Sequence, residues 1–156
     1  MTDNENFKIV LGKAMAACSR REHCISEILT MTKSWGAVEI ESIKIIKVLI
    51  DEKFINEQRF ASAFVRDKFA CNKWGKLKIS MHLKAKRIPA EIIKNALDSI
   101  DNEKYLKMIQ DLISSHRKHV KAKNNYELKS KLLRYGLSKG FESHLLYDIL
   151  GELDEE

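Results

Sequence analysis

Apolar residues recur at helical spacing along the chain and predict an all-α fold. The clearest rows are Ile43, Ile46 and Ile50; Phe60, Ala63 and Phe64; Leu106, Ile109 and Ile113; and Leu128, Leu132 and Tyr135. Because side chains three, four and seven positions apart share one face of a helix, we expect each row in the core. A single proline and 6 glycines leave little of the turn chemistry that a β-rich fold needs.

Residues that can cap a helix indicate where the helices begin. Ser19 and Glu22 fit a capping box, so a helix is expected to start there. Further starts are indicated by Asn56, Pro89, Asn102, and Asn124 with Glu127. Caps and periodicity together predict nine helices, near residues 6–18, 20–35, 38–53, 56–70, 74–86, 89–99, 102–119, 124–139 and 142–151.

The nine predicted helices fall into three sets of three. In each set an apolar pair stands nine residues apart at the end of the second helix: Ile28 and Ala37, Ile79 and Ile88, Leu132 and Phe141. We therefore predict three tandem three-helix repeats, at residues 1–54, 55–100 and 101–156, forming an elongated, curved nine-helix array. Accidental self-similarity among amphipathic helices is the alternative.

The formal net charge of +6 is unevenly distributed. Residues 1–58 hold eight basic side chains against nine acidic ones, a balance of −1. Residues 59–94 hold ten basic side chains against Asp67 and Glu91, and residues 104–139 hold ten against Asp111 and Glu127. Basic second and third repeats favour an anionic partner, either nucleic acid or an acidic protein surface. A solvated lysine-rich surface is the alternative.

Candidate partner-binding residues lie within these two basic blocks. They are Arg59, Arg66, Lys68, Lys73, Trp74, Lys76, Lys78, Lys84 and Arg87 in the second repeat, and Arg117, Lys118, Lys121 and Lys123 in the third. An aromatic ring among lysines is typical of nucleic-acid and acidic-protein interfaces. Trp74, as the first residue of a predicted helix, could instead cover a joint between repeats. Arg59 and Arg66 could instead form internal salt bridges.

The sequence offers no set of catalytic, metal-binding or cofactor-binding residues. Cys18 and Cys24 lack zinc-finger spacing and an activating partner, and His116 and His119 lack further ligands. No apolar run is long enough to cross a bilayer, and the start of the chain does not resemble a signal peptide. We expect a cytoplasmic binding protein with reduced cysteines, no small-molecule substrate and no membrane contact.

The stretch from Gln58 to Phe69, QRFASAFVRDKF, resembles the central signature of the RecX family, regulators of the bacterial recombinase RecA. The similarity extends through Asn72-Lys73-Trp74-Gly75-Lys76, through Ile79 to Ile93, and to Lys139-Gly140-Phe141. It covers most of the chain between about residues 13 and 150. The family is known as three tandem three-helix repeats, in agreement with the division above.

The resemblance implies a protein that lodges in the groove of the RecA filament on single-stranded DNA. It would modulate, and usually inhibit, RecA's ATP hydrolysis, strand exchange and coprotease activity, without catalysis of its own. Weak direct DNA contact would suit the basic blocks. A helical DNA-binding module that acts without RecA is the alternative.

Two positions depart from the family pattern. Lys86-Arg87-Ile88 stands where relatives often have Lys-Gly-Ile, so we expect this helix to close without a left-handed residue. Gly136 stands inside the eighth predicted helix, where a larger apolar residue is common. A glycine there would weaken the helix by roughly 1 kcal/mol relative to alanine.

Overall fold

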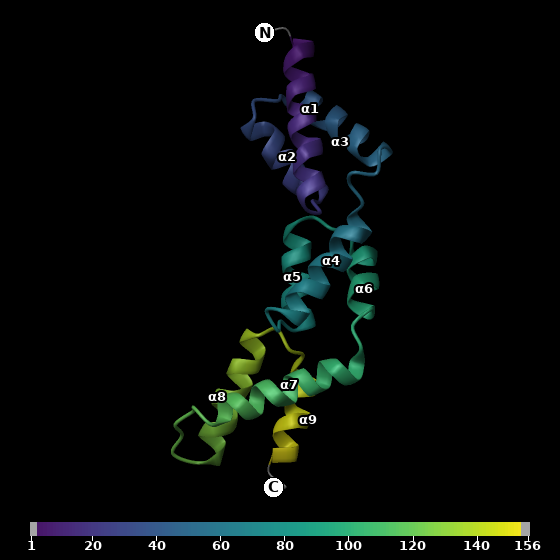
Figure 1. Cartoon of the computed structure of the whole chain (residues 1–156). Coiled ribbons are helices and arrows are strands. Elements are labelled where there is room, and N and C mark those ends of the chain that lie inside the picture. The colour runs from purple at the N-terminus through teal and green to yellow at the C-terminus, as the bar shows by residue number, and fades with distance from the viewer. Residues whose placement is uncertain (1–2, 154–156) are drawn as a thin grey trace. The chain divides into compact units, whose positions relative to one another are not determined.

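The computed structural model describes residues 3–153, which form helices joined by short loops (Figure 1). The helices are α1 Asp3–Arg20, α2 Ile25–Ser34, α3 Glu39–Asp51, α4 Glu57–Ala70, α5 Lys76–Ala85, α6 Ala90–Asp98, α7 Asn102–Arg117, α8 Asn125–Ser138 and α9 Ser143–Leu153. Within these residues the predicted all-α fold and its nine helices are confirmed. None of the described helices is both long and apolar enough to span a membrane.

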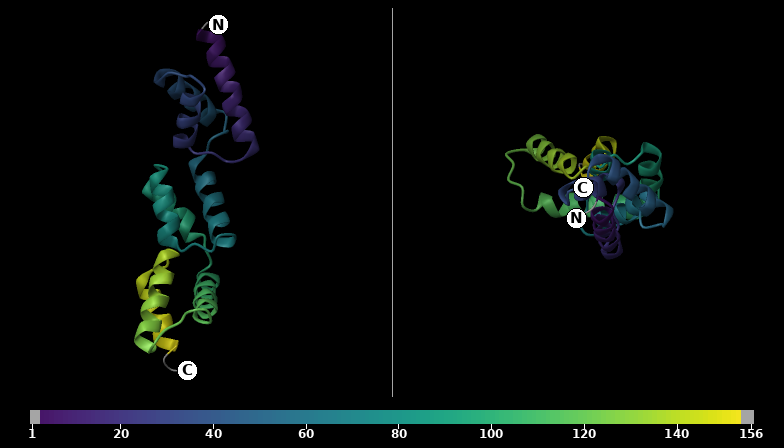
Figure 2. Two further views of the ribbon diagram at one scale, coloured as in Figure 1. Left: turned by 90° about the vertical axis from the view of Figure 1, so that its left-hand side faces the viewer. Right: turned by 90° about the horizontal axis from the view of Figure 1, so that it is seen from above.

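The chain divides into two compact units, which we call unit 1 and unit 2. Unit 1 comprises the described residues up to Phe64 together with Leu83–Lys94, and unit 2 comprises Val65–His82 together with the described residues from Asn95 onward. In unit 1, α1, α2 and α3 pack on one another, and in unit 2, α7, α8 and α9 do the same (Figure 2). The repeat boundaries at residues 1–54, 55–100 and 101–156 stay a prediction.

The same turn occurs after α2, α5 and α8, and it is the clearest structural sign of the repeat. Its central residue has a positive φ in each copy: Gly36 at 91°, Arg87 at 61° and Gly140 at 90°. The next residue donates its backbone N–H to the carbonyl five positions earlier, at 3.0 Å from Ala37 to Thr32, 3.1 Å from Ile88 to Leu83 and 3.1 Å from Phe141 to Gly136. This is the hydrogen bond of a Schellman motif. The apolar pairs noted in the sequence are buried in all three copies, so the prediction of three-helix repeats is confirmed.

The expectation for Lys86-Arg87-Ile88 was wrong, because Arg87 adopts the left-handed conformation although it has a β-carbon. Two contacts in unit 1 hold the turn. The carbonyl of Lys86 accepts a hydrogen bond from Ser26 Oγ at 2.7 Å, and Ile88 is buried. These contacts offset a conformational cost of about 1 kcal/mol.

The expected helix start at Ser19 was also wrong. Residues Ala14 and Ala17 continue the buried face of α1, and Ser19 lies inside that helix with its hydroxyl donating to the Met15 carbonyl. Helix α2 instead begins after Cys24, whose backbone N–H donates to the Glu27 carboxylate at 3.3 Å. A capped helix start is therefore present, but it lies at Cys24, five residues after the expected Ser19.

The other helix starts agree with the capping signals or lie one residue away. The amide oxygen of Asn56 accepts from the Arg59 N–H at 2.9 Å, and that of Asn124 accepts from the Glu127 N–H at 2.8 Å. Helix α6 begins immediately after Pro89. Asn102 is the first residue of α7, and the preceding Asp101 provides its cap.

Three residues expected in the core are exposed: Ile43, Ile50 and Leu106. The buried face of α3 is formed by Ser42, Ile45, Ile46 and Leu49, and Ile43 and Ile50 lie roughly 90° around the helix from its centre, at about 100° per residue. Leu106 is likewise displaced from the buried row of α7. Ile46, Ile109 and Ile113 of the same two rows are buried as expected.

The glycine inside α8 has a packing reason. A β-carbon at Gly136 would lie 2.8 Å from Leu146 Cδ1. Leu146, on α9, is fully buried and occupies the space that a larger residue at position 136 would take. The glycine therefore allows α9 to pack closely on α8, which offsets its weak helix propensity.

Candidate functional site

The structure divides the predicted partner-binding residues between the two units. Unit 2 holds Arg66, Lys68, Lys73, Trp74, Lys76, Lys78, Arg117, Lys118, Lys121 and Lys123, and unit 1 holds Arg59, Lys84 and Arg87. The second-repeat residues are thus divided between two units.

Trp74 lies at the centre of a group of lysines in unit 2. Its half-buried ring has Lys68 Nζ at 5.0 Å and Lys78 Nζ at 4.7 Å from the ring centroid. Both distances fall within the range of cation–π attraction. Trp74 precedes α5 by two residues, so its predicted place at the start of the helix was wrong. It follows Lys73, whose φ of 56° turns the chain there.

A further lysine, Lys139, completes this group, and the sequence prediction missed it. Its Nζ donates to the carbonyl of Asn72 at 3.0 Å. Burial lowers the pKa of Lys139, and the positive charges of Lys78 and Lys73 lower it further. We call Lys68, Lys73, Trp74, Lys78 and Lys139 the Trp74–lysine cluster.

Among the described residues, the charge of this cluster is only partly balanced. Lys68 Nζ lies 3.8 Å from Asp67 Oδ2. In residues 3–153, no carboxylate forms an ion pair with Lys73, Lys78 or Lys139. A bound anion would relieve the repulsion among these three ammonium groups. The cluster is therefore suited to phosphates or carboxylates.

Two glycines bring Lys139 to the start of α5. The N–H of Gly75 donates to the Lys139 carbonyl at 2.7 Å, and the N–H of Leu77 donates to the Gly140 carbonyl at 3.0 Å. A β-carbon on Gly75 would lie 2.5 Å from the backbone nitrogen of Phe141. Such a close approach of two backbones requires glycine. The Lys139-Gly140-Phe141 motif thus positions a charge as well as ending a helix.

Tyr105 of α7 stabilises the contact between the start of α5 and the α8–α9 turn. Its buried hydroxyl accepts from the Lys76 backbone N–H at 2.9 Å and donates to the Glu142 carboxylate. Burial raises the pKa of Tyr105 beyond its usual range, and the neighbouring Glu142 carboxylate adds to the effect. Lys76 Nζ lies 4.9 Å from the centroid of the Tyr105 ring, so this lysine contacts Tyr105.

The basic surface continues from Lys73 onto α7. Lys73 lines a pocket of about 420 Å³ together with Lys104, Lys107, Met108, Asp111, Leu112 and Ser115. Lys107 Nζ lies 3.6 Å from Asp111 Oδ2. Met108 and Leu112 give this pocket an apolar wall. Lys104 and Lys107 were not among the predicted binding residues, because the sequence alone does not place α7 beside Lys73.

The predicted third-repeat residues lie at the end of α7 and in the following loop. Arg117, Lys118, Lys121 and Lys123 are all exposed. The adjacent His116 stacks on Tyr135 with ring centroids 3.8 Å apart. The loop is held to α8 by Lys131 Nζ, which donates to the Lys121 carbonyl at 2.6 Å. These exposed charges form a second basic region of unit 2.

Arg59 has the internal partners that the sequence left open as an alternative. Its Nε donates to the Glu22 carboxylate, and its NH2 group donates to the carbonyls of Lys53 at 3.1 Å and Phe54 at 3.3 Å. These contacts join α4 to the α1–α2 loop and to the α3–α4 loop within unit 1. Arg66 is exposed on the same helix.

The three-helix repeats define this chain as a helical-repeat protein, and it carries an exposed basic surface. Residues 56–97 match the family model described as "RecX, second three-helix domain". A relative named "Regulatory protein RecX", from Clostridium botulinum (strain Alaska E43 / Type E3), is 30% identical over 165 residues, which cover 96% of this chain and 75% of the relative. The chain belongs to the RecX family of regulatory proteins.

Further relatives and solved structures agree with this assignment. The RecX proteins of Lactobacillus johnsonii, at 28% identity, and of another Clostridium botulinum strain, at 34%, are matched over 94% and 75% of this chain. The chain spans about half the length of these two relatives, 54% and 55%. The crystal structure of RecX from Lactobacillus salivarius has the same fold, with a TM-score of 0.82 at 22% identity over 98% of this chain and 99% of that one.

Proposed function

We propose that this chain binds the RecA filament on single-stranded DNA and inhibits its ATP hydrolysis, strand exchange and coprotease activity. Membership of the RecX family supports a regulatory role. The observation that carries the proposal is the Trp74–lysine cluster, in which the ammonium groups of Lys73, Lys78 and Lys139 lack carboxylate partners among the described residues. Such a surface can bind either the phosphates of the DNA strand or carboxylates of the filament subunits.

The proposed action is inhibition by occupancy, which requires no bond to be made or broken by this chain. Lys73, Lys78 and Lys139 would contribute charge, and the half-buried Trp74 ring would contribute apolar contact. A ring fixed between two lysines loses little conformational freedom on binding. The exposed charges at residues 117–123 would strengthen binding and make it dependent on salt.

The experiment is a titration of this chain into RecA reactions on single-stranded DNA, with ATP hydrolysis and strand exchange as readouts. The unchanged chain is expected to inhibit both. The double variant Lys73→Glu with Lys78→Glu should lose most of the inhibition, because two attractive contacts become repulsive. Lys47→Glu, an exposed reversal on α3, is the control and should inhibit normally. No inhibition by the unchanged chain at severalfold molar excess would contradict the proposal.

A second candidate function is DNA binding without RecA, which the aromatic ring among lysines favours. Its discriminating measurement is the affinity for bare single-stranded DNA as a function of salt. Tight and steeply salt-dependent binding, together with no effect on RecA, would favour this second function. Weak binding to bare DNA with strong inhibition of RecA would favour the first.

A further inference from the structure

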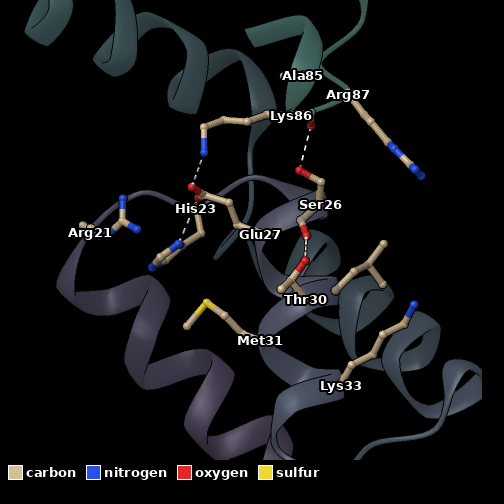
Figure 3. A pocket seen from close by; sticks show the side chains of 11 residues that line it. Arg21, His23, Ser26, Glu27, Thr30, Met31, Lys33, Ala85, Lys86 and Arg87 are labelled. Atoms are coloured by element: carbon tan, nitrogen blue, oxygen red, sulfur yellow. Dashed lines mark hydrogen bonds and ion pairs between the residues drawn. The ribbon is translucent and has the colours of Figure 1, made fainter. Parts of the chain in front are cut away.

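A pocket of about 550 Å³ lies in unit 1 between α2 and the α5–α6 turn (Figure 3). Four cationic side chains line it: Arg21, Lys33, Lys86 and Arg87. Its apolar lining comes from Leu29, Met31 and Ala85. The first repeat was near neutral by sequence, and the turn after α5 adds Lys86 and Arg87 to its surface.

One acidic residue lines the pocket, and its charge is internally balanced. The Glu27 carboxylate accepts from Lys86 Nζ at 2.9 Å and lies 3.1 Å from His23 Nδ1 (Figure 3). It also accepts from the Cys24 N–H at 3.3 Å. Burial alone would raise the pKa of Glu27, but the hydrogen bonds and charge of Lys86 with the other donors lower it. Glu27 and Lys86 therefore offset each other.

The remaining three cations carry the excess charge of the pocket. Arg21, Lys33 and Arg87 are exposed, and within residues 3–153 their side chains have no ion-pair partner. They come from the α1–α2 loop, the end of α2 and the α5–α6 turn. An anionic ligand could therefore be contacted from three elements of unit 1 at once.

Arg87 adopts a conformation that its two counterparts achieve with glycine. The equivalent turns have Gly36 and Gly140 at the left-handed position, whereas Arg87 has a φ of 61°. A residue with a β-carbon is strained there. Glycine at position 87 would make this turn more stable. An arginine there therefore contributes its side chain and not stability. That side chain lines the pocket.

We propose that this pocket binds an acidic peptide segment of a protein partner, with carboxylates on the three cations and an aliphatic side chain against Leu29 and Met31. Carboxylates match the planar guanidinium groups of Arg21 and Arg87. A nucleic acid fits less well, because among the described residues that line the pocket the only ring belongs to the buried His23, which contacts Glu27. Bases would therefore lack a stacking surface. The proposal does not depend on RecA.

The test is fluorescence anisotropy of a labelled glutamate-rich peptide with a central leucine, titrated with the full chain. Arg87→Gly is expected to weaken binding about tenfold while raising Tm, because it removes a contact and relieves the strained conformation. The matched control is Lys53→Gly. Lys53 is also left-handed, with a φ of 65°, and does not line this pocket. The control should raise Tm and leave the affinity unchanged.

Lys33→Gln gives an independent readout, since it removes a cation from a different helix and should also weaken binding severalfold. The proposal is overturned if the peptide does not bind, or if its affinity is unchanged in Arg87→Gly. It is also overturned if an oligothymidylate of equal charge binds at least as tightly and loses the same affinity in Arg87→Gly, because the pocket would then be a phosphate site. A negative result in the RecA assays would leave this measurement unaffected.

Discussion

Substituting alanine for Gly140 perturbs the contact between the α8–α9 turn and the start of α5. Gly140 has a φ of 90°, and a β-carbon there would lie 2.6 Å from the backbone nitrogen of Lys78 and even nearer its β-carbon. Gly36 provides a matched control in unit 1. It has a φ of 91° in the equivalent turn, with no heavy atom within 4 Å of the position that a β-carbon would take.

The two substitutions share one cost and differ in another. Placing alanine in the left-handed conformation costs about 1 to 2 kcal/mol at either position. At Gly140 the clash adds roughly 1 to 3 kcal/mol of overpacking. Displacement of the turn would also weaken the 3.0 Å hydrogen bond from the Leu77 N–H to the Gly140 carbonyl, worth about 1 kcal/mol. We therefore expect Gly36→Ala to cost about 1 to 2 kcal/mol and Gly140→Ala about 3 to 6 kcal/mol.

Urea unfolding followed by far-UV circular dichroism measures both variants against the unchanged chain. Gly140→Ala should lower the stability of the helices of unit 2 by at least about 2 kcal/mol more than Gly36→Ala lowers that of unit 1. Equal destabilisation by the two substitutions would refute the reasoning, because the close approach at Gly140 would then have no energetic weight.

Three further predictions follow from individual contacts. Tyr105→Phe leaves the Glu142 carboxylate without its hydroxyl donor and should lower the free energy of unfolding in urea by about 1 to 3 kcal/mol. Because the pKa of Tyr105 is raised, Tyr105 should contribute nothing to the tyrosine absorbance titration up to about pH 12, so this variant and the unchanged chain should titrate alike. Since the folded pKa of Glu27 is lowered, its ionised form stabilises the fold above the ordinary glutamate value, and this contribution is lost as the pH falls through the folded value. The stability difference between the unchanged chain and Glu27→Gln should therefore shrink as urea unfolding is repeated from about pH 6 to about pH 3, and it should not shrink if the pairing with Lys86 is unimportant. Because the pKa of Lys139 is lowered, anion binding measured by anisotropy should weaken with rising pH as its charge is lost, and less steeply in Lys139→Arg, which keeps its charge.

The repeated architecture could be predicted because it rests on local signals. Apolar periodicity, the capping asparagines Asn56 and Asn124, and the nine-residue apolar spacing each depend on neighbours within one or two turns of helix. The errors arose where a local signal had two solutions. Ser19 satisfies the pattern of a cap, but α1, whose buried face includes Ala17, continues past it to Arg20 and keeps it inside the helix.

Arg87 was misjudged because its conformation is set from outside the turn. The hydrogen bond from Ser26 to the Lys86 carbonyl joins positions 60 residues apart, and no local pattern reports it. The exposed Ile43 and Leu106 show a similar limit. Periodicity identifies an apolar row on a helix, whereas the neighbouring elements decide which row becomes the centre of the buried face.

The candidate site was predicted only in part, because it depends on contacts between elements distant in sequence. Lysines near Trp74 in sequence were identified, but Lys139 reaches them only through the Gly75 and Gly140 contact. Conversely, Lys84 continues the same basic block in sequence and belongs to unit 1. Charge density along the chain therefore did not indicate which of the lysines share one surface.

The most direct test of the proposed function is co-sedimentation of this chain with preformed RecA filaments on single-stranded DNA. The unchanged chain and Lys47→Glu are expected to pellet with the filaments, and the double variant Lys73→Glu with Lys78→Glu is expected to stay in the supernatant with its helical circular dichroism intact. Failure of the unchanged chain to pellet, or equal pelleting of the double variant, would contradict the account.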